Sequence, residues 1–158
     1  MRIITESPEE TEAAGRALGR FLKEKKKTGA VFLFGDLGAG KTTFIKGIAS
    51  AFGIPERDIG SASFVIAAEY ETTPPFYHID LYRMEGEEDS EALGIWEYIE
   101  SGGVAVVEWS ERLSSLPGGA VTVTLSYHNE HAREILVEGV PDSVFTEETR
   151  KSDRQGGA

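Results

Sequence analysis

The sequence contains no cysteine, and this absence excludes several classes of protein at once. Without thiols the chain has no disulfide framework, no cysteine-based zinc or iron–sulfur site and no thiol nucleophile. Long apolar runs are also missing, since no segment approaches the roughly 18 consecutive apolar residues that a membrane-spanning helix needs. The chain starts with Met1-Arg2 and a polar stretch, so we expect neither a cleaved signal peptide nor a membrane anchor. These absences predict a soluble, cytoplasmic protein.

Basic residues are few, because 16 Lys and Arg stand against 27 Asp and Glu and leave a formal net charge of -11. Binding of a phosphate backbone needs clusters of Lys and Arg, so we expect no direct contact between this chain and nucleic acid. The acids gather between Glu69 and Glu111, where twelve carboxylates accompany one basic residue, Arg83. Two interpretations stay open for this stretch: a solvated face, or a surface that meets a basic partner or a divalent cation.

The length and composition are those of one globular domain. A chain of 158 residues, 40% of them apolar, buries roughly 70% of the surface that it exposes when unfolded. Beyond Pro141 the sequence is polar and ends in Arg154-Gln155-Gly156-Gly157-Ala158. We therefore expect a folded domain over residues 1–140 and a flexible tail over residues 141–158.

Hydrophobic periodicity and turn residues predict helices that alternate with short buried strands. Ser7-Pro8-Glu9-Glu10 is a helix start, with a Ser cap, a Pro in the first turn and a Glu placed to close a capping box. Helices are expected from residue 8 to the lysines at 25–27, over 42–52 and over 90–101; strands are expected over 30–34, 64–70, 76–80, 104–109, 121–126 and 134–140. This order predicts a three-layer α/β domain with a mostly parallel central sheet and an antiparallel C-terminal hairpin.

The most informative motif is Gly35-Asp36-Leu37-Gly38-Ala39-Gly40-Lys41-Thr42, followed by Thr43, which satisfies G-x-x-x-x-G-K-[ST]. The glycines let the loop curl so that backbone N–H groups point at phosphate oxygens. Lys41 supplies a positive charge to the outer phosphates, and the Thr42 hydroxyl is placed to bind Mg²⁺. An apolar strand precedes the loop and a helix follows it, and that helix adds a positive partial charge at its N-terminus. The motif with both flanks predicts a P-loop NTPase fold that binds a nucleotide.

Two predicted strands end in an acid, Asp80 and Glu108. Ligands of open α/β sheets bind beyond the carboxyl ends of the strands, so both acids are expected near the loop, where a carboxylate holds hydrated Mg²⁺. One assignment makes Asp80 a magnesium residue and Glu108 a metal ligand or water-orienting base. The reverse assignment is open. Ser63 is a further candidate for the metal, with an ordinary loop as its alternative. His78 is expected in the core.

The nucleotide is expected to be ATP. A GTPase carries an N-K-x-D motif, and the only Asn here, Asn129, is followed by Glu130. A small-molecule kinase, which would use the same phosphate loop, is the alternative function, but arginines for a lid over a second substrate are scattered along this chain. Hydrolysis of ATP by so small a domain implies a partner protein.

These residues together resemble the TsaE (formerly YjeE) family of ATPases. The resemblance rests on the phosphate loop with Thr43, the Ser-x-Ser-Phe segment, His78-Ile79-Asp80-Leu81-Tyr82-Arg83 and Glu108-Trp109, in this order between about Thr5 and Val140. It implies a cytoplasmic Mg-dependent ATPase, weak alone, that acts on the TsaB–TsaD heterodimer during synthesis of threonylcarbamoyladenosine in tRNA.

The resemblance also implies roles for single residues. Lys41 and Thr42 resemble the phosphate and magnesium residues of the family, and Asp80 and Glu108 its catalytic acids. Trp109 resembles the family tryptophan beside that glutamate and is counted with the nucleotide-binding residues. One segment departs from the family pattern, because Ser61-Ala62-Ser63-Phe64 stands where Ser-Pro-Thr-Phe is typical. The hydroxyl is kept at Ser63, while the loss of Pro gives the backbone more freedom.

Overall fold

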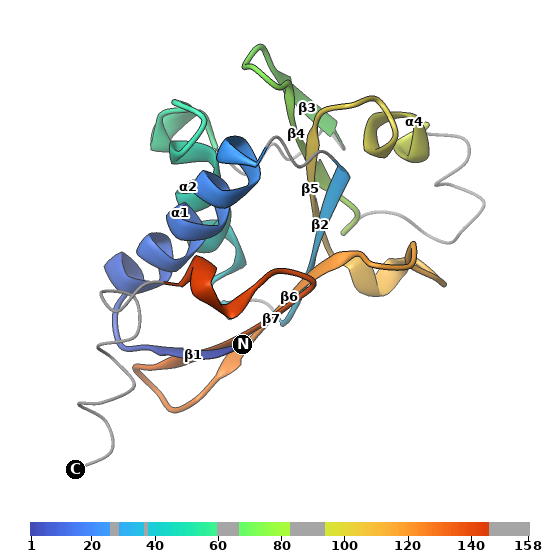
Figure 1. Ribbon diagram of the computed structural model, residues 1–158. Helices are drawn as coiled ribbons and strands as arrows, with labels where there is room; N and C mark the ends of the chain where they lie inside the picture. The colour runs from blue at the N-terminus through green and yellow to red at the C-terminus, as the bar shows by residue number, and fades with distance from the viewer. Residues whose placement is uncertain (26–28, 37, 60–66, 83–93, 146–158) are drawn as a thin grey trace.

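The computed structural model describes residues 1–25, 29–36, 38–59, 67–82 and 94–145 of the chain. Its elements are β1 (Arg2–Thr5), α1 (Pro8–Glu24), β2 (Gly29–Phe34), α2 (Lys41–Ser50), η1 (Glu56–Asp58), β3 (Ala67–Tyr70), β4 (Phe76–Asp80), α4 (Ile95–Ile99), β5 (Val104–Glu108), η2 (Ser110–Arg112), β6 (Val121–Tyr127), β7 (Arg133–Glu138) and η3 (Asp142–Val144). The strands form one seven-stranded sheet in the order β1-β7-β6-β2-β5-β4-β3 (Figure 1).

The centre of the sheet is parallel and its edges are antiparallel. β2 pairs in parallel with both β5 and β6, and β5 pairs in parallel with β4. β7 joins β6 and β1 in antiparallel pairs, and β3 joins β4 in the same way. The predicted fold class, with its parallel centre and antiparallel C-terminal hairpin, is confirmed.

Helices cover both faces of the sheet, which makes three layers (Figure 1). On one face α1 and α2 pack on side chains such as Val104 and Val106 of β5. On the other face α4 packs on the alternate residues of the same strand, Ala105 and Val107. All five residues of β5 are buried, because a parallel strand between two helical layers has no solvated face.

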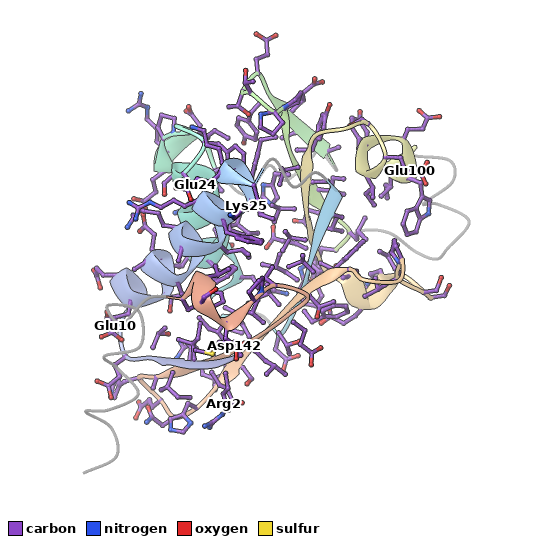
Figure 2. The ribbon with its side chains drawn as sticks, in the orientation of Figure 1. Arg2, Glu10, Glu24, Lys25, Glu100 and Asp142 are labelled. Atoms are coloured by element: carbon purple, nitrogen blue, oxygen red, sulfur yellow. The ribbon has the colours of Figure 1, made fainter. Side chains whose placement is uncertain are left out.

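The start of α1 is the predicted one, with a rearranged capping box. Ser7 is the N-cap, and its Oγ accepts a hydrogen bond from the Glu10 backbone N–H at 3.2 Å. The Glu10 carboxylate accepts from the backbone N–H of Glu6, at 2.6 Å, instead of from that of Ser7. Glu10 lies at the first turn, and Glu24 and Lys25 lie at the opposite end, where the Lys25 cation suits the helix dipole (Figure 2).

Three parts of the described chain differ from the sequence-based expectation. The stretch after Met1 forms β1, with Ile3 1% exposed, because its backbone pairs with β7 more than a hundred residues later. Gly94 takes a left-handed φ of 66° and caps α4, so a continuous helix over 90–101 is wrong. The folded chain continues past residue 140, because η3 places Phe145 in the core at 1% exposure.

The helices α1 and α2 are in backbone-to-backbone contact, which positions the start of α2. A Cβ at Gly47 would collide with the carbonyl oxygen of Glu12, and one at Gly15 would collide with that of Phe44. Only glycine allows this close approach. The start of α2, which carries Lys41, is thereby held against the rest of the domain.

We expect Gly47→Ala to lower the free energy of unfolding by about 2–3 kcal/mol, because the added methyl group forces the two helices apart. The change is opposite in sign to the roughly 1 kcal/mol that alanine contributes in an unconstrained helix. Urea unfolding measures the difference. Gly118→Ala is the matched control, since a Cβ there meets no atom within 4 Å; equal stability of the two variants would contradict the contact.

Candidate functional site

The phosphate loop (residues 35–42) joins the end of β2 to the start of α2, at the carboxyl edge of the parallel strands. Gly35, Gly38 and Gly40 have φ of 144°, 79° and 100°, values that side chains rarely adopt. A Cβ at Gly38 would also lie 2.6 Å from the Tyr127 hydroxyl oxygen. Gly40 caps α2 without any side-chain hydrogen bond, so the first amides of α2 face the loop unblocked. Such a helix start is suited to an anion.

Lys41 folds back over this loop. Its ammonium donates a hydrogen bond to the Gly35 carbonyl oxygen and lies 3.5 Å from the centroid of the Trp109 ring. Burial lowers the pKa of Lys41 from its ordinary value, while the nearby carboxylates of Glu111, Glu108, Asp80 and Asp36 act in the opposite direction. The ammonium is thus held inside the loop and surrounded by negative charge.

Asp80 and Glu108 lie directly opposite each other at the ends of β4 and β5. Glu108 is 7% exposed, and Asp80 accepts a hydrogen bond from the backbone N–H of Tyr82 at 2.9 Å. Their strands flank β2 on one side, so the acids and the phosphate loop share one edge of the sheet. The structure therefore brings together Lys41 and both acids, as the sequence predicts.

His78 pairs with Glu108, which sequence reasoning missed by placing this histidine in the core. Its Nε2 lies 2.7 Å from Glu108 Oε2, and the two side chains are 10% and 9% exposed. The signal in the sequence was the alternation of His78 with Asp80, because residues two apart on a strand share a face. One carboxylate oxygen of Glu108 is thereby oriented by the imidazole.

Trp109 follows Glu108 in a strained conformation. Its φ of 58° is the single positive value of a non-glycine residue in the described part of the chain. The ring contacts the Lys41 ammonium and packs on Tyr82 with centroids 5.0 Å apart. Residues held in this region of backbone space cost about 1–3 kcal/mol and gather at functional sites.

A third acid, Glu111, reaches the loop and was not predicted from the sequence. It lies in η2, and its Oε2 accepts a hydrogen bond from the Gly35 backbone N–H at 3.0 Å. The sequence holds no local signal for this contact, because 76 residues separate the partners.

A pocket of about 140 Å³ opens behind the loop, between the start of α1 and the β6–β7 turn. Arg133 borders it and connects it to the loop, since its guanidinium lies 3.4 Å from the Gly38 carbonyl oxygen and 4.1 Å from the Tyr127 ring centroid. The residues that line the pocket are Thr5, Ser7, Pro8, Thr11, Gly38, Gly40, Thr43, His131 and Arg133. The pocket thus continues the loop on the side away from Asp80 and Glu108.

The donors near the loop fit a hard cation such as Mg²⁺. Thr42, Asp80 and Glu108 offer oxygen ligands, and among the described residues no three His, Asp or Glu side chains are grouped to hold a metal by themselves. Mg²⁺ usually keeps waters and binds one or two protein carboxylates together with substrate phosphates. The residues here therefore match a metal shared with a nucleotide better than a metal cage made by the protein alone.

The remaining candidates divide into placed and unplaced residues. Asp36, Gly38, Gly40 and Thr43 lie in or beside the loop, whereas the Ala39 side chain is 1% exposed and packs into the core. Any ligand contact of Ala39 would thus come from its backbone. Candidates that fall outside the described residues are Leu37, the segment 61–64 with Ser63, Arg83, and the acids at 85–91.

The comparison with known proteins decides the family. A family model described as "Threonylcarbamoyl adenosine biosynthesis protein TsaE" matches residues 5–135. The chain belongs to the TsaE family. This confirms the resemblance drawn from the motifs, and the matched residues include the phosphate loop, both strand-terminal acids, Trp109 and Glu111.

Relatives of the TsaE family match along most of the chain. The tRNA threonylcarbamoyladenosine biosynthesis protein TsaE of Treponema pallidum is 40% identical over 138 residues, which make up 87% of this chain and 99% of the relative. The protein of the same name from Bacillus subtilis is 39% identical over 153 residues, or 94% and 93% of the two chains. The crystal structure of Bacillus subtilis YdiB matches with a TM-score of 0.71 at 32% identity and covers 100% of this chain and 96% of YdiB.

No helix within the described ranges combines the length and the apolar character that crossing a bilayer requires.

Proposed function

We propose that this TsaE-family protein is a Mg-dependent ATPase that supports synthesis of threonylcarbamoyladenosine in tRNA. The observation that carries the proposal is the meeting of Lys41, Asp80 and Glu108 at one edge of the sheet, beside a loop that leads into the start of α2, where no side chain caps the helix. A phosphate loop, a lysine and two carboxylates are the parts that phosphoryl transfer to water needs. The family and the names of its relatives support the pathway.

Each residue has a defined task in this proposal. The loop amides and the start of α2 bind phosphate oxygens, and Lys41 neutralises charge on the outer phosphates. Thr42 and Asp80 would hold Mg²⁺, which when bound neutralises the β- and γ-phosphates. Glu108, oriented by His78, accepts the proton of the water that attacks the γ-phosphorus, and ADP leaves with the broken bond's electron pair.

We place the rest of the nucleotide in the pocket next to the loop. Gly38, Gly40 and Thr43 belong both to the loop region and to the wall of this pocket. A triphosphate whose outer end lies at Lys41 would place its nucleoside there, beside Arg133. ATP is preferred over GTP, because the base-reading N-K-x-D motif is absent from the sequence.

We further propose the TsaB–TsaD heterodimer as the partner and the cytoplasm as the compartment. We expect an immobilised copy of this protein to retain purified TsaB–TsaD in the presence of Mg-ATP and to hydrolyse ATP faster in their company than alone. The measurement is a pull-down with and without nucleotide, followed by phosphate release from the recovered material.

The outcomes of this experiment separate the competing functions. Partner binding without phosphate release would replace the ATPase by a nucleotide-gated binding module. ATP consumption matched by phosphorylation of a small acceptor in a metabolite screen would favour the kinase. If the protein binds neither the nucleotide nor the partner, the proposal is wrong.

A further inference from the structure

We infer that Glu111 is a specificity-determining residue of the nucleotide site, whose carboxylate weakens the binding of ATP more than that of ADP. The inference rests on the proposed function, because it assumes that ATP binds at the phosphate loop. Glu111 lies outside the G-x-x-x-x-G-K-[ST] motif, and its effect on nucleotide affinity can be measured without hydrolysis.

The carboxylate of Glu111 is held in place by the backbone that carries it. Trp109, in its left-handed conformation, turns the chain sharply out of β5, and Ser110 closes this turn by donating its buried hydroxyl to the Val107 carbonyl oxygen at 3.0 Å. The N–H of Arg112 donates to the Trp109 carbonyl oxygen at 3.0 Å. The short helix η2 therefore returns toward the loop and brings Glu111 within hydrogen-bonding distance of Gly35.

The residue that Glu111 contacts is the one that also holds Lys41. Gly35 donates its N–H to Glu111 Oε2 and accepts the Lys41 ammonium at its carbonyl oxygen. Burial lowers the pKa of Lys41, and among the carboxylates that oppose this effect Glu111 acts most strongly, ahead of Glu108 and Asp80. The carboxylate of Glu111 thus lies close to the ammonium that would meet the outer phosphates.

A fixed negative charge at this position acts mainly on the outermost phosphate. The phosphates approach Lys41 from the loop, so ATP brings an additional charged group into the field of Glu111 that ADP lacks. Glu111 is engaged by a backbone N–H, a neutral partner that leaves the net charge of the carboxylate in place. At a few ångströms in a half-solvated site such repulsion changes an affinity by about three- to tenfold.

The test is a binding measurement on Glu111→Gln. The amide oxygen of Gln still accepts from Gly35, so the variant removes the charge and keeps the hydrogen bond. By calorimetry with Mg²⁺ at low salt, we expect ATP to bind about fivefold tighter than to the unaltered chain and ADP less than twofold tighter. The gain for ATP should shrink at high salt, because screening weakens the repulsion that was removed.

Two further variants make the result specific. Glu138→Gln also removes one negative charge. Glu138 ends β7 opposite Thr122 at the start of β6, at the end of the strands away from the phosphate loop. This variant should leave the affinities for ATP and ADP unchanged. Glu111→Ala removes the charge and the acceptor together and should tighten ATP binding as Glu111→Gln does. Tightening by Ala without tightening by Gln would overturn the electrostatic assignment.

Failure of this inference differs from failure of the proposed function. Suppose that the unaltered chain binds ATP, and that Glu111→Gln binds ATP with the same or lower affinity or tightens ADP binding by the same factor as ATP binding. Glu111 then has no role in specificity, and the proposed function stands. If the unaltered chain binds neither ATP nor ADP, both are wrong.

Discussion

Lys41→Ala should weaken ATP binding by about 100-fold, because it removes the one ammonium that the structure places inside the phosphate loop. A charged hydrogen bond to phosphate contributes about 1.5–3 kcal/mol, and the substitution also leaves the neighbouring carboxylates without their counter-charge. Titration calorimetry with Mg-ATP measures the loss. The domain should remain folded, because the variant removes a desolvated charge from a site that alanine can occupy at the start of a helix.

Lys46→Ala is the matched control for this experiment. Lys46 belongs to the same helix, α2, and pairs with Glu56 at 3.4 Å, away from the phosphate loop. The control should bind ATP like the unaltered chain. An unchanged affinity of Lys41→Ala, with its circular dichroism spectrum intact, would remove the phosphate loop from the proposed function.

Glu108→Ala should keep ATP binding and lose hydrolysis by about 10²- to 10⁴-fold, the range that a general base contributes. The reason is its geometry: the side chain is buried, one oxygen is oriented by His78, and the residue lies opposite Asp80 at the sheet edge. Phosphate release in the presence of the partner proteins, together with calorimetry of the same variant, measures the two effects. Glu108→Gln gives a second test in which the pairing with His78 is conserved.

Asp80→Asn separates the two carboxylates, whose roles the sequence left interchangeable. If Asp80 holds the metal, this variant should bind ATP more weakly when Mg²⁺ is present and approach the unaltered chain when Mg²⁺ is removed. If it instead retains Mg-dependent binding and loses only hydrolysis, while Glu108→Ala loses the Mg²⁺ effect, the assignment of the two acids is reversed. Turnover at the original rate in Glu108→Ala would exclude Glu108 from the reaction.

The parts of the fold that follow from local physics were predictable. The strand before the phosphate loop is a short apolar run, and the helix after the loop begins directly after its last glycine, Gly40. β2 and α2 therefore lie within two residues of their expected bounds. Strands β4 and β5 were recognisable for the same reason, and each ends at the predicted acid. The position of these two acids near the phosphate loop followed from a general rule about parallel sheets, because ligand sites lie beyond the carboxyl ends of the strands.

Elements that depend on distant partners were not predictable. β1 is four residues long and has no strong pattern of its own; it exists because β7 supplies the hydrogen bonds. Phe145 is an isolated aromatic residue in a polar stretch, and only its packing reveals that it belongs to the core. Gly94 stands within a helical pattern, and its left-handed conformation makes it the N-cap, so α4 begins only after it.

The sequence by itself determined the motif of the loop, the identity of the two strand-terminal acids and the family. A phosphate loop is a local structure whose glycines and lysine lie within eight residues, so its motif can be recognised from the sequence alone. The tertiary structure alone decided which further side chains contact the loop and these acids. His78 meets Glu108 across 30 residues and Glu111 meets Gly35 across 76, because neighbouring strands and a turn forced by Trp109 bring distant segments to one edge of the sheet.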